Sequence, residues 1–285
     1  MRTLSFFVEN EYDNRKVLHY LRGGAGLSVR LVRSLKQVDN GIILNGIPAR
    51  TVDTIKAGDK ITINIPDDKI TAQPTECEIE VLYEDEDLLI VNKPALLPMH
   101  QSHNHQGDTL ENAVAWHLAK SNKASTFRAI GRLDKGTSGI VFCAINSLAA
   151  AKLSGQIKKQ YIAIATGVLK GKGTIDKPIF RPDPLKTLRA VGENGERAVT
   201  HYEVIDGNSE MTKLKINLET GRTHQIRVHF SYMGNALVGD RMYGEIHHDI
   251  DRQALHCGYA KFRHPITGKE MEIYAELPQD MAELI

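Results

Sequence analysis

The sequence predicts an α+β fold: a large domain built on a mixed, largely antiparallel sheet, preceded by a small α+β domain. In the larger part, apolar or alternating segments of strand length follow one another with few helical segments between them. A polar segment bounded by Pro66 and Pro74 is typical of a linker. A chain of 285 residues is long enough for one large and one small domain. We therefore expect domains over residues 1–70 and 71–285.

Two short helices and a hairpin are expected in the small domain. Apolar residues at helical spacing predict helices over residues 15–21 and 31–38. Residues 42–46, Ile-Ile-Leu-Asn-Gly, predict a short strand and a tight turn. Isoleucines alternate along residues 61–65, as in a half-buried strand.

The larger domain is expected to contain many strands and two helices. Strands are predicted at residues 79–83, 88–92, 138–144, 160–166, 198–205 and 213–218. Helices are predicted over residues 109–119 and 224–233, with Thr223 as the N-cap of the second. Internal repeats and low-complexity stretches are absent from the sequence.

Residues 131–139, Gly-Arg-Leu-Asp-Lys-Gly-Thr-Ser-Gly, are the stretch that specifies a reaction. Asp134 lies between Arg132 and a turn of small polar residues, and an apolar run at 140–144 follows as a buried strand. A carboxylate there is held rigidly, and its basic and hydroxyl neighbours keep it ionised. The stretch resembles the signature of RNA pseudouridine synthases of the ribosomal large-subunit type, in which the aspartate is the nucleophile.

Three further motifs resemble the same family and occur in the family's order. They are Ile-Val-Asn-Lys-Pro-Ala at 90–95, Lys-Gln-Tyr-Ile-Ala at 159–163 and Gly-Arg-Thr-His-Gln-Ile-Arg-Val-His at 221–229. Gly239-Asp240, Tyr243-Gly244 and Leu255-His256 also fit. The resemblance spans about residues 76–276 and implies a mixed sheet with a long central cleft, with the nucleophile on a loop at its middle.

The resemblance implies an isomerase that turns uridine into pseudouridine in structured RNA. The base is cut from its sugar, rotated and rejoined through a ring carbon, so no redox change and no cofactor are expected. A carboxylate suits this reaction because it can attack or shield the anomeric carbon. By carry-over, Asp134 is the nucleophile and Arg227 its cation, with Arg222 the less favoured candidate for that cation. Tyr161 is expected to stack on the uracil and to take part in proton removal.

Substrate binding is expected to involve Arg132, Arg222 and Leu255. Arg132 would fill the gap that a flipped-out uridine leaves, since a base inside a helix cannot be reached. The first 70 residues resemble a small S-four-like RNA-binding domain, named for a ribosomal protein. RNA contacts are expected there from Arg30, Arg33 and Lys36, although such charges equally suit a solvated surface. This domain favours ribosomal RNA as the target and leaves transfer RNA open.

Composition excludes several other classes of function. Lys and Arg total 36 against 35 Asp and Glu, so a phosphate-binding surface must be local. The three cysteines are far apart and give no zinc or redox spacing. No signal peptide and no membrane span are predicted, which favours a reducing, cytoplasmic setting, and we expect a monomer.

Two clusters of histidines raise the question of a metal site. His100, His103 and His105 lie in a polar loop without an accompanying cysteine or carboxylate cluster, so they are expected to border the RNA cleft. The residues 247–249, His-His-Asp, are expected in a surface turn. No metal is therefore predicted.

The sequence argues against two alternatives to the enzyme. A catalytically silent RNA-binding or chaperone-like protein of the same fold would not need Asp134, Tyr161 and Arg227 intact, because burying charge is costly. A glycoside hydrolase would need a second carboxylate as acid/base, and no motif supplies one.

Overall fold

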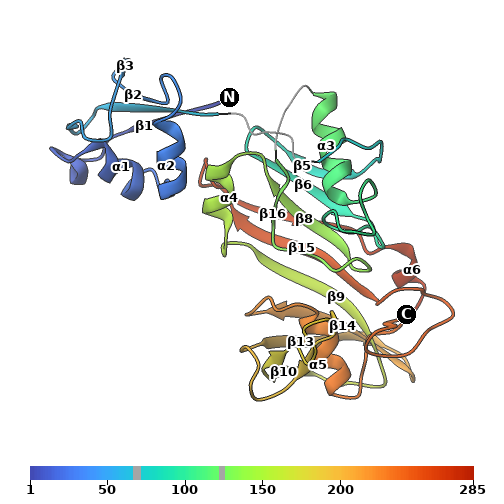
Figure 1. Cartoon of the computed structure of the whole chain (residues 1–285). Coiled ribbons are helices and arrows are strands. Elements are labelled where there is room, and N and C mark those ends of the chain that lie inside the picture. The colour runs from blue at the N-terminus through green and yellow to red at the C-terminus, as the bar shows by residue number, and fades with distance from the viewer. Residues whose placement is uncertain (67–71, 122–125) are drawn as a thin grey trace.

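The computed structural model describes residues 1–66, 72–121 and 126–285. The expected boundary at residues 70/71 lies outside the described residues. Among these described residues, one sheet lies in the first 65 residues, and a larger sheet and a separate two-stranded ribbon lie in the remainder (Figure 1). Among the described residues, no helix has both the length and the apolar character needed to cross a bilayer.

The small N-terminal domain is a four-stranded antiparallel sheet carrying two helices. Its strands, in the spatial order β1-β4-β2-β3, are β1 (Arg2–Phe7), β4 (Lys60–Ile65), β2 (Ile42–Leu44) and β3 (Ile47–Pro48). A 3-10 helix, η1 (Asn10–Tyr12), precedes α1 (Val17–Gly23) and α2 (Val29–Leu35). Ser28 caps α2 by accepting a hydrogen bond from the Leu31 N–H. The sequence predicts both helices within about two residues at each start and does not predict β1.

The large domain is one ten-stranded sheet that is antiparallel except for one strand pair, which confirms the predicted fold class. Eight strands run in the order β10-β13-β14-β9-β15-β8-β6-β5, with β16 on β15 and β7 on β8. Their bounds are β5 (Glu80–Glu84), β6 (Leu88–Lys93), β7 (Arg128–Ile130), β8 (Ser138–Ala144), β9 (Lys158–Thr166), β10 (Lys172–Asp176), β13 (Val199–Gly207), β14 (Met211–Leu218), β15 (Leu255–Arg263) and β16 (Glu270–Tyr274). A separate ribbon pairs β11 (Ile179–Phe180) with β12 (Ala190–Val191). The helices are α3 (Leu110–Lys120), α4 (Ser147–Leu153), α5 (Gln225–Tyr232) and α6 (Gln279–Ala282).

The centre of the sheet brings β8 and β15 together as its parallel pair. All seven residues of β8 are buried, as its apolar sequence predicts. Gly139 has φ +112°, and a Cβ there would lie 2.3 Å from the Cys257 carbonyl oxygen, so only glycine lets the two backbones meet. The loop 131–137 that precedes β8 is thereby fixed against β15.

The start of α5 differs from the prediction. Thr223 is not the N-cap: the helix begins at Gln225, and its N-cap is His224, at φ 57° and ψ 19°. A left-handed residue directly before the helix replaces the extended residue that a threonine cap requires. The Gln225 side chain satisfies local donors instead, accepting from the Thr220 hydroxyl and the Arg222 N–H.

The two domains are in contact. Leu148 of α4 is fully buried in the apolar core of the N-terminal domain, and Figure 1 shows α4 on the side of the large sheet that faces α2. Arg2 of β1 donates to both carboxylate oxygens of buried Asp87, at 3.0 and 2.9 Å, and also pairs with Glu86. A proline-bounded linker suggests few contacts between the domains, and the structure corrects that expectation.

This interface predicts that substitutions of two leucines on α4 destabilise different domains. Leu148→Ser should speed amide hydrogen exchange in α1 and α2 while leaving β8 protected, because Leu148 packs in the N-terminal core. Its matched control, Leu153→Ser, should expose β8 instead, since Leu153 is buried in the core of the large domain. Each change should cost about 2–5 kcal/mol of local stability. Exchange that rises in the same elements for both variants would contradict the interface.

Candidate active site

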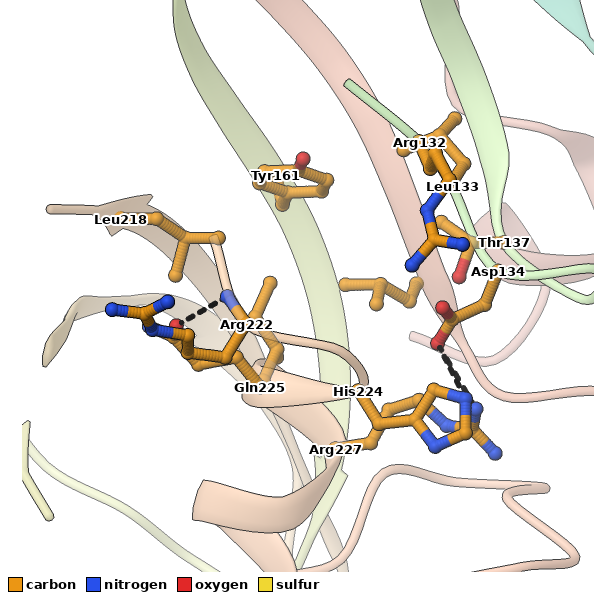
Figure 2. A pocket seen from close by; sticks show the side chains of 12 residues that line it. Arg132, Leu133, Asp134, Thr137, Tyr161, Leu218, Arg222, His224, Gln225 and Arg227 are labelled. Atoms are coloured by element: carbon orange, nitrogen blue, oxygen red, sulfur yellow. Dashed lines mark hydrogen bonds and ion pairs between the residues drawn. The ribbon is translucent and has the colours of Figure 1, made fainter. Parts of the chain in front are cut away.

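A single pocket collects the residues that the sequence proposes for chemistry and substrate binding. It lies between the loop that precedes β8 and the start of α5, and Leu218 at the end of β14 lines it as well. The sequence-predicted residues in its lining are Arg132, Asp134, Tyr161, Arg222, Arg227 and Leu255. Figure 2 shows the ring of Tyr161 on one side and Asp134 with Arg132 on the other. Residues more than 120 positions apart in the sequence thus share one cavity.

Asp134 is held by one strong contact and remains open to the pocket. Its Oδ2 accepts a hydrogen bond from Arg227 Nη1 at 3.0 Å, and its side chain is 26% exposed. Its backbone carbonyl accepts from the Thr137 N–H at 3.0 Å, which closes the turn of the loop. A carboxylate with a free oxygen edge is therefore presented to the cavity.

Arg227 is buried between two carboxylates. Its Nε and Nη2 donate to the two oxygens of Asp240 at 2.7 and 2.8 Å, and the Asp240 side chain is fully buried. Burial opposes the charge on Arg227, but the hydrogen bond and charge of Asp240, with a smaller contribution from Asp134, raise its pKa. The sequence places Arg227 beside Asp134 and assigns no role to Asp240.

Tyr161 of β9 is almost completely enclosed, with 8% of its surface exposed. Burial, followed by Cys257 and the charge of Asp134, raises its pKa well above the ordinary tyrosine value. Its hydroxyl therefore carries its proton at neutral pH. An aromatic ring with a protonated hydroxyl can stack on a planar base and donate a hydrogen bond to it.

His224 is a site residue that sequence reasoning misses. Its Nδ1 lies 2.8 Å from the Tyr243 hydroxyl, and its Nε2 lies 3.9 Å from Asp134 Oδ2. The Tyr243 oxygen already accepts the Arg189 N–H at 2.9 Å, so we assign its own proton to His224 Nδ1. His224 Nε2 then carries the ring proton on the side of Asp134. Burial lowers the His224 pKa, Arg227 and Arg189 act in the same direction, and Asp134 and Asp240 oppose them. The one signal in the sequence is a histidine inside the 221–229 motif.

Two buried basic side chains, Lys93 and Arg252, donate hydrogen bonds to backbone carbonyls of the loop that carries Asp134. Lys93 Nζ donates to the carbonyl oxygens of Pro94, Leu97 and Lys135, at 2.9, 2.9 and 3.1 Å. Burial, together with the charge of Arg252, lowers the Lys93 pKa to about 7. Arg252 donates to the Gly136 carbonyl at 3.2 Å. The two residues that follow Asp134 in its loop are thus tied through their backbone carbonyls.

The histidine clusters do not converge on one site. His105 contacts Asp108 and His100 lies 3.5 Å from Glu111, so the loop histidines face separate carboxylates. In the part of the chain that the structure describes, the group close enough to hold an ion is residues 247–249, whose ligand atoms lie within 4.8 Å of one another. The two rings of that group stack at 4.6 Å, and the group lies at the surface, as expected.

The residues expected to bind RNA in the small domain lie outside this pocket. Arg30 and Arg33 are exposed on α2, and Lys36 is exposed at its C-cap. The opposite face of α2 is buried through Leu31, Val32 and Leu35.

Comparisons with known proteins agree on one family. Residues 87–232 match the family model described as RNA pseudouridylate synthase. "Uncharacterized RNA pseudouridine synthase YjbO" of Bacillus subtilis is 36% identical, covering 92% of this chain and 96% of that protein. "Ribosomal large subunit pseudouridine synthase D" of Vibrio cholerae is 34% identical, covering 87% and 83%. The solved structure "Human RNA Pseudouridylate Synthase Domain Containing 1" superposes with a TM-score of 0.58 at 26% identity, covering 70% and 83%.

The contacts of Arg227 with Asp240 and Asp134 predict that substituting Arg227 costs far more stability than substituting Arg222. Arg227→Met should destabilise the protein by about 3–5 kcal/mol, because it leaves the fully buried Asp240 carboxylate without a cationic partner. Arg222→Met is the matched control, since Arg222 pairs with Glu196 at an exposed site, and should cost less than about 1 kcal/mol. Urea unfolding at neutral pH measures both. Equal costs would show that the Arg227–Asp240 pair is not a structural anchor.

Proposed function

The chain belongs to the RNA pseudouridine synthase family, and on that premise we propose that it isomerises uridines of ribosomal RNA with Asp134 as the nucleophile. The family makes the protein an isomerase that acts on RNA. The preference for ribosomal RNA is supported by relatives named ribosomal large subunit pseudouridine synthase D. Transfer RNA is the alternative target.

The observation that carries the proposal is the Asp134–Arg227–Asp240 arrangement. Asp240 offsets the buried charge of Arg227 through two hydrogen bonds, and one further guanidinium N–H reaches Asp134 at 3.0 Å. Asp134 thus has a guanidinium partner and is not held in a bidentate pair, so its second oxygen stays free of Arg227. It is also the pocket carboxylate with exposed surface, since Asp240 is fully buried.

The proposed reaction follows from this geometry. Asp134 attacks or shields the anomeric carbon C1′ as the N1–C1′ bond breaks, and the free uracil turns within the pocket. A bond then forms between C5 and C1′, C5 loses its proton, and N1 gains one. Tyr161 would stack on the base throughout, and its hydroxyl would take part in the removal of the proton from C5. Arg132 is exposed at the pocket edge, where it can occupy the space of a flipped-out nucleotide.

The same geometry argues against the two alternatives. A hydrolase needs a second carboxylate that can exchange a proton with the substrate, and Asp240 is fully buried with both of its oxygens on Arg227. A silent RNA binder would have no use for the buried charged triad, which costs desolvation.

The small domain is proposed to add affinity for RNA and no chemistry. The exposed position of Arg30, Arg33 and Lys36 leaves these cations accessible to phosphates. A second binding element on the same chain raises the local concentration of substrate. A monomer remains a prediction.

Asp134→Asn should lower isomerisation to below about one percent of the wild-type rate while RNA affinity is retained, because the amide keeps the shape and removes the charge. Release of tritium from uridine labelled at C5, in an unmodified large-subunit ribosomal RNA transcript, measures turnover. Asp206→Asn, an exposed carboxylate outside the pocket, is the control. Residual turnover above about one percent, a loss of only about 3 kcal/mol of barrier lowering, would remove Asp134 from its role.

Tyr161→Phe should keep RNA binding and lose most turnover, because the ring still stacks and the hydroxyl is gone. Tyr274→Phe removes the same atom from a side chain on β16 that is 66% exposed and should be silent. Normal tritium release by Tyr161→Phe would mean that the hydroxyl is structural.

The low His224 pKa predicts a pH dependence. The ring is neutral at pH 7, and as pH falls below its ordinary value of 6.5 it gains a proton and a charge that pairs with Asp134. Activity measured as kcat/KM should therefore fall on the acid side, at a pH below 6.5. Tyr243→Phe removes the proton donor that holds the neutral ring, so the acid limb should move to higher pH. An unchanged limb, or one moved to lower pH, would reverse the assignment of the Nδ1 hydrogen bond.

A further inference from the structure

The ribbon of β11 and β12 and the loop between its strands line a second cavity. It lies beside the pocket that contains Asp134, here named the uridine pocket. This cavity of about 370 Å³ is lined by residues that include Phe180, Arg181, Arg189, Glu196, Arg222 and Thr223. Arg222 also lines the pocket that contains Asp134, so the two cavities share one wall. Neither the mechanism above nor the sequence motifs use Arg181 or Arg189.

The two loop arginines are fixed by the loop itself. Arg181 Nε donates to the Lys186 carbonyl at 2.7 Å, and Arg189 Nη1 donates to the Thr187 and Leu188 carbonyls at 2.7 and 3.0 Å. The Arg189 backbone N–H is bound to the Tyr243 hydroxyl, which ties the loop to the wall of the active site. Ordering these side chains in advance lowers the entropy that a ligand must remove.

These guanidinium groups keep donors for a ligand. A guanidinium offers five N–H donors, and the contacts above use one on Arg181 and at most two on Arg189. Within residues 1–66, 72–121 and 126–285, neither group forms an ion pair with a carboxylate. Arg222 donates Nε to the Arg197 carbonyl at 3.1 Å and pairs with Glu196 on the cavity rim. Two unpaired guanidinium groups and one that is singly paired thus face one cavity.

We propose that Arg181, Arg189 and Arg222 form a binding site for a backbone phosphate of the RNA strand that flanks the target uridine. This rests on the proposed function, because it takes RNA to be the ligand. Planar guanidinium forks match phosphate oxygens, and three of them in one cavity bind a dianion or a phosphodiester better than a single exposed cation. The wall shared with the uridine pocket favours RNA over an acidic peptide: a nucleotide in one cavity places its neighbouring backbone at the other.

Binding of a fluorescent oligouridylate of about 12 nucleotides, a length that spans a typical single-strand site, tests the proposal without any use of turnover. Anisotropy is followed between about 50 and 200 mM salt for the full chain and for the double variant Arg181→Met/Arg189→Met. Arg263→Met is the control, because Arg263 is exposed on β15 and lies outside both cavities. Loss of this one phosphate contact should weaken binding about tenfold at low salt and make the slope of log Kd against log salt shallower by about 0.7.

A charge-preserving pair, Arg181→Lys/Arg189→Lys, separates lost charge from a collapsed loop. It should recover most of the salt slope and only part of the affinity, because lysine keeps the charge and loses the fork. The proposal is overturned if the methionine pair binds like the wild type and Arg263→Met, or if the lysine pair is as defective as the methionine pair. Asp134→Asn lacks the proposed nucleophile and should bind the oligouridylate like the wild type. The binding result can therefore be interpreted even if the proposed chemistry is wrong.

Discussion

The buried guanidinium of Arg227 is the interaction on which the site depends. Removing a charge from water costs several kcal/mol unless good partners surround it. Asp240, which is fully buried, accepts two hydrogen bonds from Arg227, and Asp134 at the pocket wall accepts one. The unequal sharing matters, because Asp240 anchors the arginine and Asp134 is left with an exposed edge. Both structural and chemical roles of Arg227 follow from that division.

The fold serves this arrangement by bringing three distant segments to one point. The loop before β8 carries Asp134, α5 carries Arg227, and the turn after it carries Asp240. β8 and β15 pair in parallel, which is possible only because Gly139 lacks a Cβ. This pairing fixes the position at which the loop ends and β8 begins. Lys93 and Arg252 then hold the loop through the carbonyls of Lys135 and Gly136.

Local patterns in the sequence predict the strands that carry a clear apolar run, such as β8 and β6, and short motifs predict which residues share the pocket. β15 is missed because Gly258 interrupts its alternation and the strand shifts register between Cys257 and Tyr259. The left-handed His224 is missed because it lies outside any turn signal such as the Asn-Gly pair at 45–46, and a histidine at positive φ is uncommon. Asp240 and the loop arginines receive no role from the sequence, because only the tertiary structure shows that Asp240 is buried against Arg227 and that Arg181 and Arg189 line a cavity.

A double-mutant cycle between Asp134 and Arg227 tests most directly whether the arginine acts through the aspartate. Arg227→Lys keeps the charge and loses the fork, and Asp134→Asn removes the charge that the fork holds. Rates of tritium release at excess enzyme are compared for both single variants and the double variant. If Arg227 serves catalysis by holding Asp134, the double variant should react within about twofold of Asp134→Asn alone. If the two losses multiply, Arg227 acts on the substrate independently, and the triad is not the basis of catalysis.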